Sequence, residues 1–118
     1  MKRFFLLFAM LMCMVTFMPA QSDANRKKAA EYQREAEYYQ KQAASHYREA
    51  EYYLQKAKNY QKEEEYYIRH SDYDKARTYS EYAKKEMDKY RTELRLASQA
   101  EDKAATYRRW AADALRNN

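Results

Sequence analysis

The sequence contains no glycine, one proline and one cysteine. Glycine is the residue that reaches positive φ at little cost, so its absence disfavours tight β-hairpin turns and excludes Gly-rich phosphate-binding loops. Proline and cysteine are confined to Pro19 and Cys13, and the rest of the 118 residues carries neither a proline break nor a thiol. The length suits one domain, and the composition predicts an all-α fold.

The charge balance is mild for so polar a chain. Charged residues make up 35% of the sequence, both signs are mixed, and the formal net charge is +5. An excess of this size does not predict nucleic-acid binding, and we expect no nucleic-acid partner.

Residues 1–24 predict a secretory signal peptide. Lys2 and Arg3 precede the apolar run FFLLFAMLMCMVTFM, and small residues follow it. Cleavage is expected after Ala20 or after Ala24, where small residues occupy both the −3 and −1 positions. The alternative is an uncleaved membrane anchor, but the run is short for a span and no stop-transfer segment follows. The expected location is secreted or periplasmic, and the mature chain would contain no cysteine.

A fourteen-residue repeat follows. AEYYQKQAASHYRE, residues 36–49, is succeeded by AEYYLQKAKNYQKE, residues 50–63. Fourteen residues are two heptads, and this spacing predicts a coiled-coil seam. With position a set at Ala29, the a and d positions are mostly Ala and Tyr, respectively. The a series is Ala29, Ala36, Ala43, Ala50, Ala57, Glu64 and Ser71; the d series is Tyr32, Tyr39, His46, Tyr53, Tyr60 and Tyr67.

The heptad frame shifts by five residues at HSDYD, residues 70–74, which a continuous coiled coil does not absorb. A second a series begins at Ala76 and a second d series at Tyr79. Ser71 and Asp72 are good helix N-caps, and Ser71 has capping-box-like spacing to Asp74. We therefore expect residues 25–118 to form a hairpin, with a helix over 25–69, a turn over 70–72 and a helix over 73–116.

The predicted fold is an antiparallel two-helix coiled-coil hairpin with an Ala/Tyr seam. If the chain reverses at residues 71 and 72, facing residues have numbers that add to about 143, and most layers set a Tyr against an Ala. Examples are Tyr60 with Ala83 and Tyr39 with Ala104. Two such hairpins could pair into a four-helix bundle, which would bury the further apolar rows at e and g.

Two surface rows are candidate binding sites. The first is a docking face of exposed aromatic side chains, made of Tyr38, Tyr52, Tyr66 and Trp110. The second is a basic stripe at position f, made of Arg34, Lys41, Arg48, Lys62 and Arg69. Glutamates flank the stripe at b and g, which favours a solvated, salt-bridged surface over a polyanion site.

The sequence offers no catalytic or metal-binding constellation. His46 falls in the seam and His70 at the turn, and neither has the Glu-x-x-His spacing of di-metal bundles. The paired carboxylates are expected to face solvent, where nothing would shift their pKa. We expect no enzyme activity, no metal and no cofactor.

One local resemblance exists. SDYDKARTYSEYAKK, residues 71–85, resembles the second helix of a tetratricopeptide repeat, in which a short turn precedes a Tyr- and Ala-rich helix. The Trp and Gly of that family's first helix are missing, so the resemblance implies a helix after a turn and nothing further.

The sequence thus predicts an exported, non-enzymatic helical protein that binds another protein or itself, or has a structural role. The alternative is a cationic module that contacts acidic lipid or cell-wall polymer, although contact with a membrane surface is not favoured. A third, weaker alternative is a metal or small-ligand carrier built in a bundle core.

Overall fold

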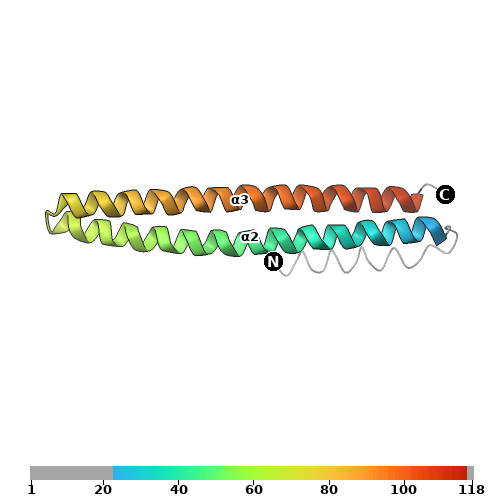
Figure 1. Cartoon of the computed structure of the whole chain (residues 1–118), viewed down its shortest axis with the longest axis horizontal. Coiled ribbons are helices and arrows are strands. Elements are labelled where there is room, and N and C mark those ends of the chain that lie inside the picture. Colours follow the sequence, from blue (N-terminus) through green and yellow to red (C-terminus); the bar gives the residue numbers. More distant parts are fainter. Residues whose placement is uncertain (1–22, 117–118) are drawn as a thin grey trace.

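The computed structural model describes residues 23–116, which form two long helices joined by a short turn. Helix α2 spans Asp23–Arg69 and helix α3 spans Tyr73–Arg116, and the two run side by side over their full length (Figure 1). The molecule measures 75 × 22 × 13 Å. The predicted all-α helical hairpin is confirmed.

Helix α2 begins two residues earlier than the sequence analysis placed it. The predicted signal peptide lies almost wholly within residues 1–22, outside the described residues, and so does cleavage after Ala20. Ala24, the alternative cleavage site, is the second residue of α2.

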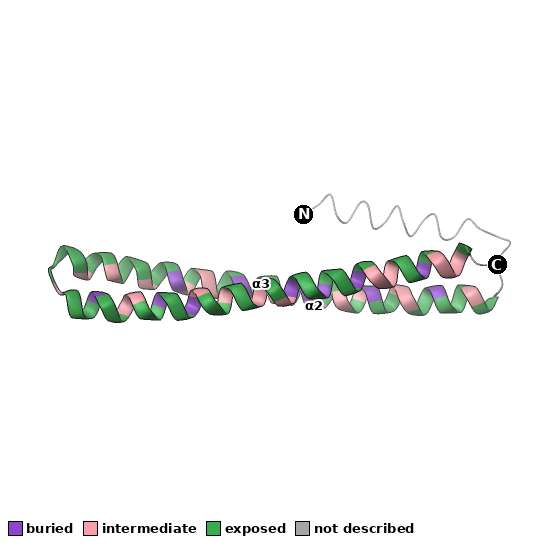
Figure 2. Ribbon diagram, turned by 90° about the horizontal axis from the view of Figure 1, so that it is seen from above, coloured by how far each residue is buried: buried purple, intermediate pink, exposed green. Residues whose placement is uncertain are grey.

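Alanine fills the core. The buried apolar residues in both helices are all alanines, and no large side chain is fully buried. They recur at intervals along both helices, drawn in purple in Figure 2. They are Ala29, Ala36, Ala43, Ala50, Ala57, Ala76, Ala83, Ala97, Ala100, Ala104 and Ala111. Small side chains let two helix axes approach closely, and the tyrosines at d are half-buried beside them. The seam has the predicted Ala/Tyr composition.

The reversal is a helix C-cap followed directly by an N-cap. Ser71 has φ of 58°, in the left-handed region, and its amide donates to the carbonyl of Ile68 at 3.0 Å. The Asp72 amide donates to the carbonyl of Tyr67 at 2.9 Å. This pair of bonds is the Schellman motif. The Asp72 carboxylate then accepts from the amide of Lys75 at 3.3 Å and caps α3. Asp72 is therefore the N-cap, and the capping box expected from Ser71 is wrong because Ser71 ends the preceding helix.

Candidate functional site: a repeating aromatic face

Aromatic side chains collect on one long side of the hairpin. In an antiparallel pair, the d positions of both helices lie on the same side of the seam, bordered by the g positions. Tyrosines at c of α2 extend this side outward, because each packs on the neighbouring d tyrosine. We call this surface the aromatic face: the d positions of both helices, position c of α2 and position g of α3.

Near the turn, five rings form the turn cluster. Tyr66 meets Tyr67 edge to face, with ring centroids 5.1 Å apart; Tyr67 stacks on Tyr79 of α3 at 5.4 Å; and Tyr79 meets Tyr82 edge to face at 5.8 Å. Tyr60 touches both Tyr79 and Tyr82. Across the two helices, an edge-to-face contact is therefore followed by a stacked contact and then by a second edge-to-face contact. Both geometries are preferred for aromatic pairs.

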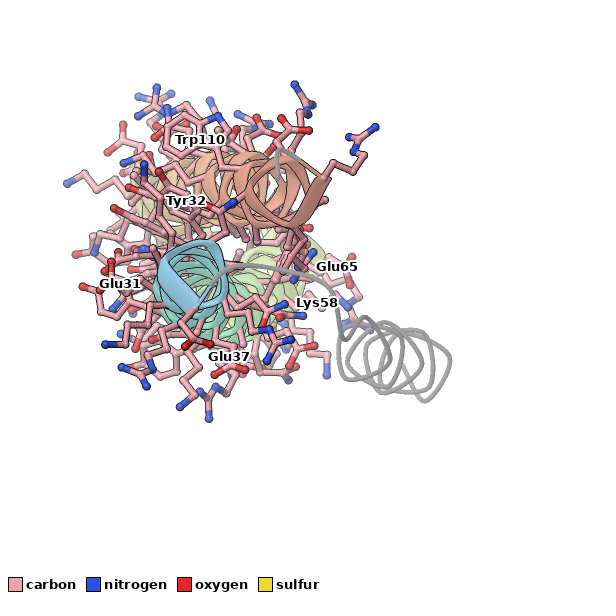
Figure 3. The ribbon with its side chains drawn as sticks, turned by 90° about the vertical axis from the view of Figure 1, so that its right-hand side faces the viewer. Glu31, Tyr32, Glu37, Lys58, Glu65 and Trp110 are labelled. Carbon is pink, nitrogen blue, oxygen red and sulfur yellow. The ribbon has the colours of Figure 1, made fainter. Side chains whose placement is uncertain are left out.

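Near the free ends of the helices, five rings form the open-end cluster. Tyr38 meets Tyr39 edge to face at 5.2 Å, Tyr39 stacks on Tyr107 at 5.6 Å, and Tyr107 meets Trp110 edge to face at 5.1 Å. Tyr32 touches both Tyr107 and Trp110. Figure 3 shows Tyr32 and Trp110 together on one side of the seam, with Lys58 and Glu65 on the opposite side. Every ring contact of the turn cluster has a counterpart in the open-end cluster. The residue numbers of the counterparts are 28 lower in α2 and 28 higher in α3.

The repeat extends to α3, which the sequence analysis missed. Asp-Lys-x-x-Thr occurs at residues 74–78, 88–92 and 102–106, a spacing of fourteen. Each threonine hydroxyl donates to the carbonyl of the aspartate four residues earlier, at 3.0–3.2 Å. Each lysine ammonium lies 5.2–5.6 Å from the centroid of a d tyrosine across the seam. The pairs are Lys75 with Tyr67, Lys89 with Tyr53, and Lys103 with Tyr39. Aligning α3 with itself at this spacing would have found the pattern.

The middle of the aromatic face is polar. His46 Nδ1 lies 2.6 Å from a carboxylate oxygen of Glu93, which occupies the d position where the two clusters have a tyrosine. Glu86 is 7% exposed; its Oε1 accepts from Lys89 Nζ at 3.4 Å, while its buried Oε2 has no hydrogen-bond partner. The expectation that all carboxylates face solvent is therefore wrong for Glu86, because its d position is packed against α2. Its place in the d series was the available signal.

The four predicted docking residues lie on this one face. Tyr38, Tyr52, Tyr66 and Trp110 are each about half exposed, at 46–54%. Tyr38 and Trp110 are joined through Tyr39 and Tyr107 in the open-end cluster. The rings are thus held by their neighbours rather than projecting singly, and their outer surfaces remain available for contact.

The basic stripe lies on the outer side of α2, and all five of its side chains are exposed. None of them forms an ion pair within residues 23–116. Arg69 instead donates through Nε to the backbone carbonyl of Glu65 at 3.4 Å. The structure therefore separates the stripe from the aromatic face and leaves its charges open to solvent.

Two tyrosines are electrostatically perturbed. A hydrogen bond to the Glu101 carboxylate raises the pKa of Tyr47 above its ordinary value of 10.0, because the bond favours the protonated phenol. Electrostatic repulsion from Tyr67 is the larger cause that raises the pKa of Tyr79, because phenolates at both positions would repel each other. Partial burial raises this pKa further. Both phenols are neutral at physiological pH.

Other chemical features are sparse. A hollow of about 490 Å³ lies along the seam between Gln61 and Glu64 of α2 and Met87 and Arg91 of α3. Within residues 23–116 no group of three His, Cys, Asp or Glu side chains could hold a metal ion. Neither of the two described helices is long and apolar enough to cross a membrane.

No family model matches the chain, and no curated protein or solved structure is similar enough to count as a match.

Proposed function

We propose that this is an exported, non-enzymatic helical protein that binds a protein partner, either another protein or a second copy of itself, along its aromatic face. The observation that carries the proposal is the duplicated cluster. Five rings at each end make the same contacts, about 42 Å apart at the rise of a helix, which presents a regular linear surface rather than a pocket. Long helical partners suit such a surface because their side chains recur at matching intervals.

Exposure and stability support the same function. Within residues 23–116, five of the eight exposed large apolar side chains lie on the aromatic face: Tyr38, Tyr52, Tyr66, Tyr82 and Trp110. An apolar surface of this extent typically marks a contact site. A seam whose buried apolar residues are all alanine also stabilises a hairpin weakly for its length, so covering the face would supply stability that the seam lacks.

Export is the part of the proposal that comes from the sequence alone. Lys2, Arg3 and the apolar run should direct secretion, followed by cleavage after Ala20 or Ala24. N-terminal sequencing of the protein recovered from the cell envelope or the medium tests this. An intact Met1 in the membrane fraction would make the chain an anchored protein.

Binding is tested by affinity capture with matched variants. Tyr38, Tyr52 and Tyr66 changed together to Ser should remove the captured protein, while Lys41, Arg48 and Lys62 changed together to Ser should retain it. Both variants alter three exposed side chains of α2, and circular dichroism verifies that both stay helical. Equal capture by the two variants would reject the aromatic face as the binding surface.

The rival function is contact with acidic lipid or cell-wall polymer through the basic stripe, and the observation in its favour is that these side chains form no ion pairs within residues 23–116. Polyanion binding falls steeply with salt, whereas apolar docking does not. Sedimentation with anionic vesicles or purified cell wall, at low and high salt, separates the two. Loss of binding in the stripe variant alone would favour the rival.

A further inference from the structure

We propose that the occupant of the aromatic face is a second copy of this chain, related to the first by a two-fold axis that runs along the hairpin. Both turns then lie at the same end of a four-helix assembly. This inference rests on the proposed function and names its partner.

The charges at position g of the two helices select this arrangement. Position g of α2 carries three glutamates, the acidic row Glu35, Glu49 and Glu63, with one lysine, Lys56, between the last two. Position g of α3 carries the basic row Lys75, Lys89 and Lys103. All six side chains are exposed, and each row repeats about every 21 Å, which is fourteen residues of helix. None of the three glutamates forms an ion pair within residues 23–116. Their charges are therefore available to a partner.

Only one face-to-face symmetry makes these rows complementary. Rotation about an axis along the hairpin places α2 of one copy over α3 of the other, at the same level. Glu63 then lies within five residues of the level of Lys75 of the second copy, about 7.5 Å along the axis, and Glu35 lies at the same distance from the level of Lys103. Lys56 comes within two residues of the level of Lys89, so the attraction is between the rows as a whole and is strongest toward their ends. Rotation about an axis across the hairpin places α2 over α2, and so sets the acidic row against itself and the basic row against itself. Opposed like charges disfavour that alternative.

Side-chain size agrees with the charge pattern. Under the first rotation, Tyr38, Tyr52 and Tyr66 of one copy reach the levels of Thr106, Thr92 and Thr78, respectively, of the other. Each of these threonine hydroxyls is already bonded to a carbonyl of its own helix. Large rings thus oppose small side chains whose polar groups need no further partner, which is how facing layers fill space.

The available area also fits a dimer. A strip 75 Å long and about 10 Å wide, the usual spacing of neighbouring helices, covers roughly 750 Å² on each copy. Stable interfaces bury about 800 Å² per partner. The His46–Glu93 pair and Glu86 would lie midway along this interface, where isolated polar groups specify register.

Charge reversal tests the arrangement. Analytical ultracentrifugation measures the dimer dissociation constant of the protein as it is recovered from cells, with its native N-terminus. We expect the wild type to dimerise. The acidic variant, Lys75→Glu with Lys103→Glu, and the basic variant, Glu35→Lys with Glu63→Lys, should each dissociate at least about tenfold more readily. An equimolar mixture of the two should recover the wild-type affinity as a heterodimer. Arg34→Glu with Lys62→Glu, on the basic stripe, should leave the affinity within about twofold.

Disulfide crosslinking in a Cys13→Ser background decides the direction of the axis. Tyr66→Cys in one copy should crosslink to Thr78→Cys in the other. A crosslink between Tyr66→Cys and a cysteine at the open end, such as Tyr38→Cys, would overturn the proposed symmetry.

A wild type that stays monomeric at its highest soluble concentration, or a dimer that resists both charge reversals, would overturn self-association. The capture experiment then decides separately whether the face binds a different protein. Failure of the dimer and failure of the proposed function are therefore distinguishable.

Discussion

At the scale of single residues, the informative positions are those that depart from the Ala/Tyr pattern. Glu86 lies in the seam with one carboxylate oxygen unpartnered, and His46 pairs with Glu93 at the midpoint of the aromatic face. Buried polar groups stabilise less than apolar ones of similar volume, but they restrict which partners and registers fit. We interpret these side chains as lowering the stability of the hairpin while restricting the partner and the register that it accepts.

Glu86→Leu should raise the free energy of unfolding by about 1 kcal/mol or more, because it removes a buried, half-satisfied carboxylate and adds apolar contact. Its partner Lys89 is exposed and can return to water. Thermal denaturation measures the change. Glu81→Leu, at an exposed position of the same helix, should stay within about 0.5 kcal/mol of the wild type. A lower melting temperature for Glu86→Leu would show that the carboxylate stabilises the seam.

The raised pKa of Tyr47 predicts a stability change in alkali. The folded state binds the phenol proton more strongly than the unfolded state, so this contribution is complete below pH 10 and disappears as pH rises through the folded pKa. NMR titration of ring-labelled tyrosine should show the pKa of Tyr47 falling in Glu101→Gln. An unchanged value would remove Glu101 as the cause. Tyr47→Phe should abolish this part of the pH dependence.

At the scale of elements, the sequences of both helices repeat every fourteen residues, although the repeated motif differs between them. Helix α2 repeats Ala and paired Tyr, while α3 repeats Asp-Lys-x-x-Thr. Their cross-helix contacts therefore share one period, and the three lysines of α3 cover every second d position of α2, which holds Tyr67, Tyr53 or Tyr39. The turn has to join the two patterns in register, which it does with three residues.

Ser71→Gly should stabilise the hairpin by roughly 0.5–1 kcal/mol, because glycine adopts the left-handed conformation without the strain of a β-carbon. Ser45→Gly, at an exposed position inside α2, is the matched control and should destabilise by about 0.5 kcal/mol. Chemical denaturation compares them. If both changes destabilise, the turn does not hold residue 71 in the left-handed region in solution.

At the scale of the whole molecule, the hairpin is long and thin, with a core only one small side chain deep on each helix. Burial of apolar surface is the main source of folding stability, and this shape buries little of it. A partner that covers the aromatic face would therefore contribute to folding as well as to function.

Melting should consequently depend on chain concentration. If two copies share the aromatic face, mass action raises the melting temperature as concentration increases. Circular dichroism across a concentration series measures this, and the acidic variant from the charge-reversal pair is the control, because its melting should depend much less on concentration. A wild-type melting temperature that does not change would indicate that the hairpin is stable as a monomer.

The sequence by itself determined the secondary structure and the hairpin, because both follow from local chemistry. The absence of glycine and the heptad spacing specify helices, and the phase shift at HSDYD specifies a break between them. It also identified Tyr38, Tyr52, Tyr66 and Trp110 as exposed aromatic residues. Only the tertiary structure decided that ten rings form two equivalent clusters along the docking face that the sequence predicted, and that Glu86 is buried. Those features depend on which side of each helix meets the other, and hence on contacts between residues far apart in the chain.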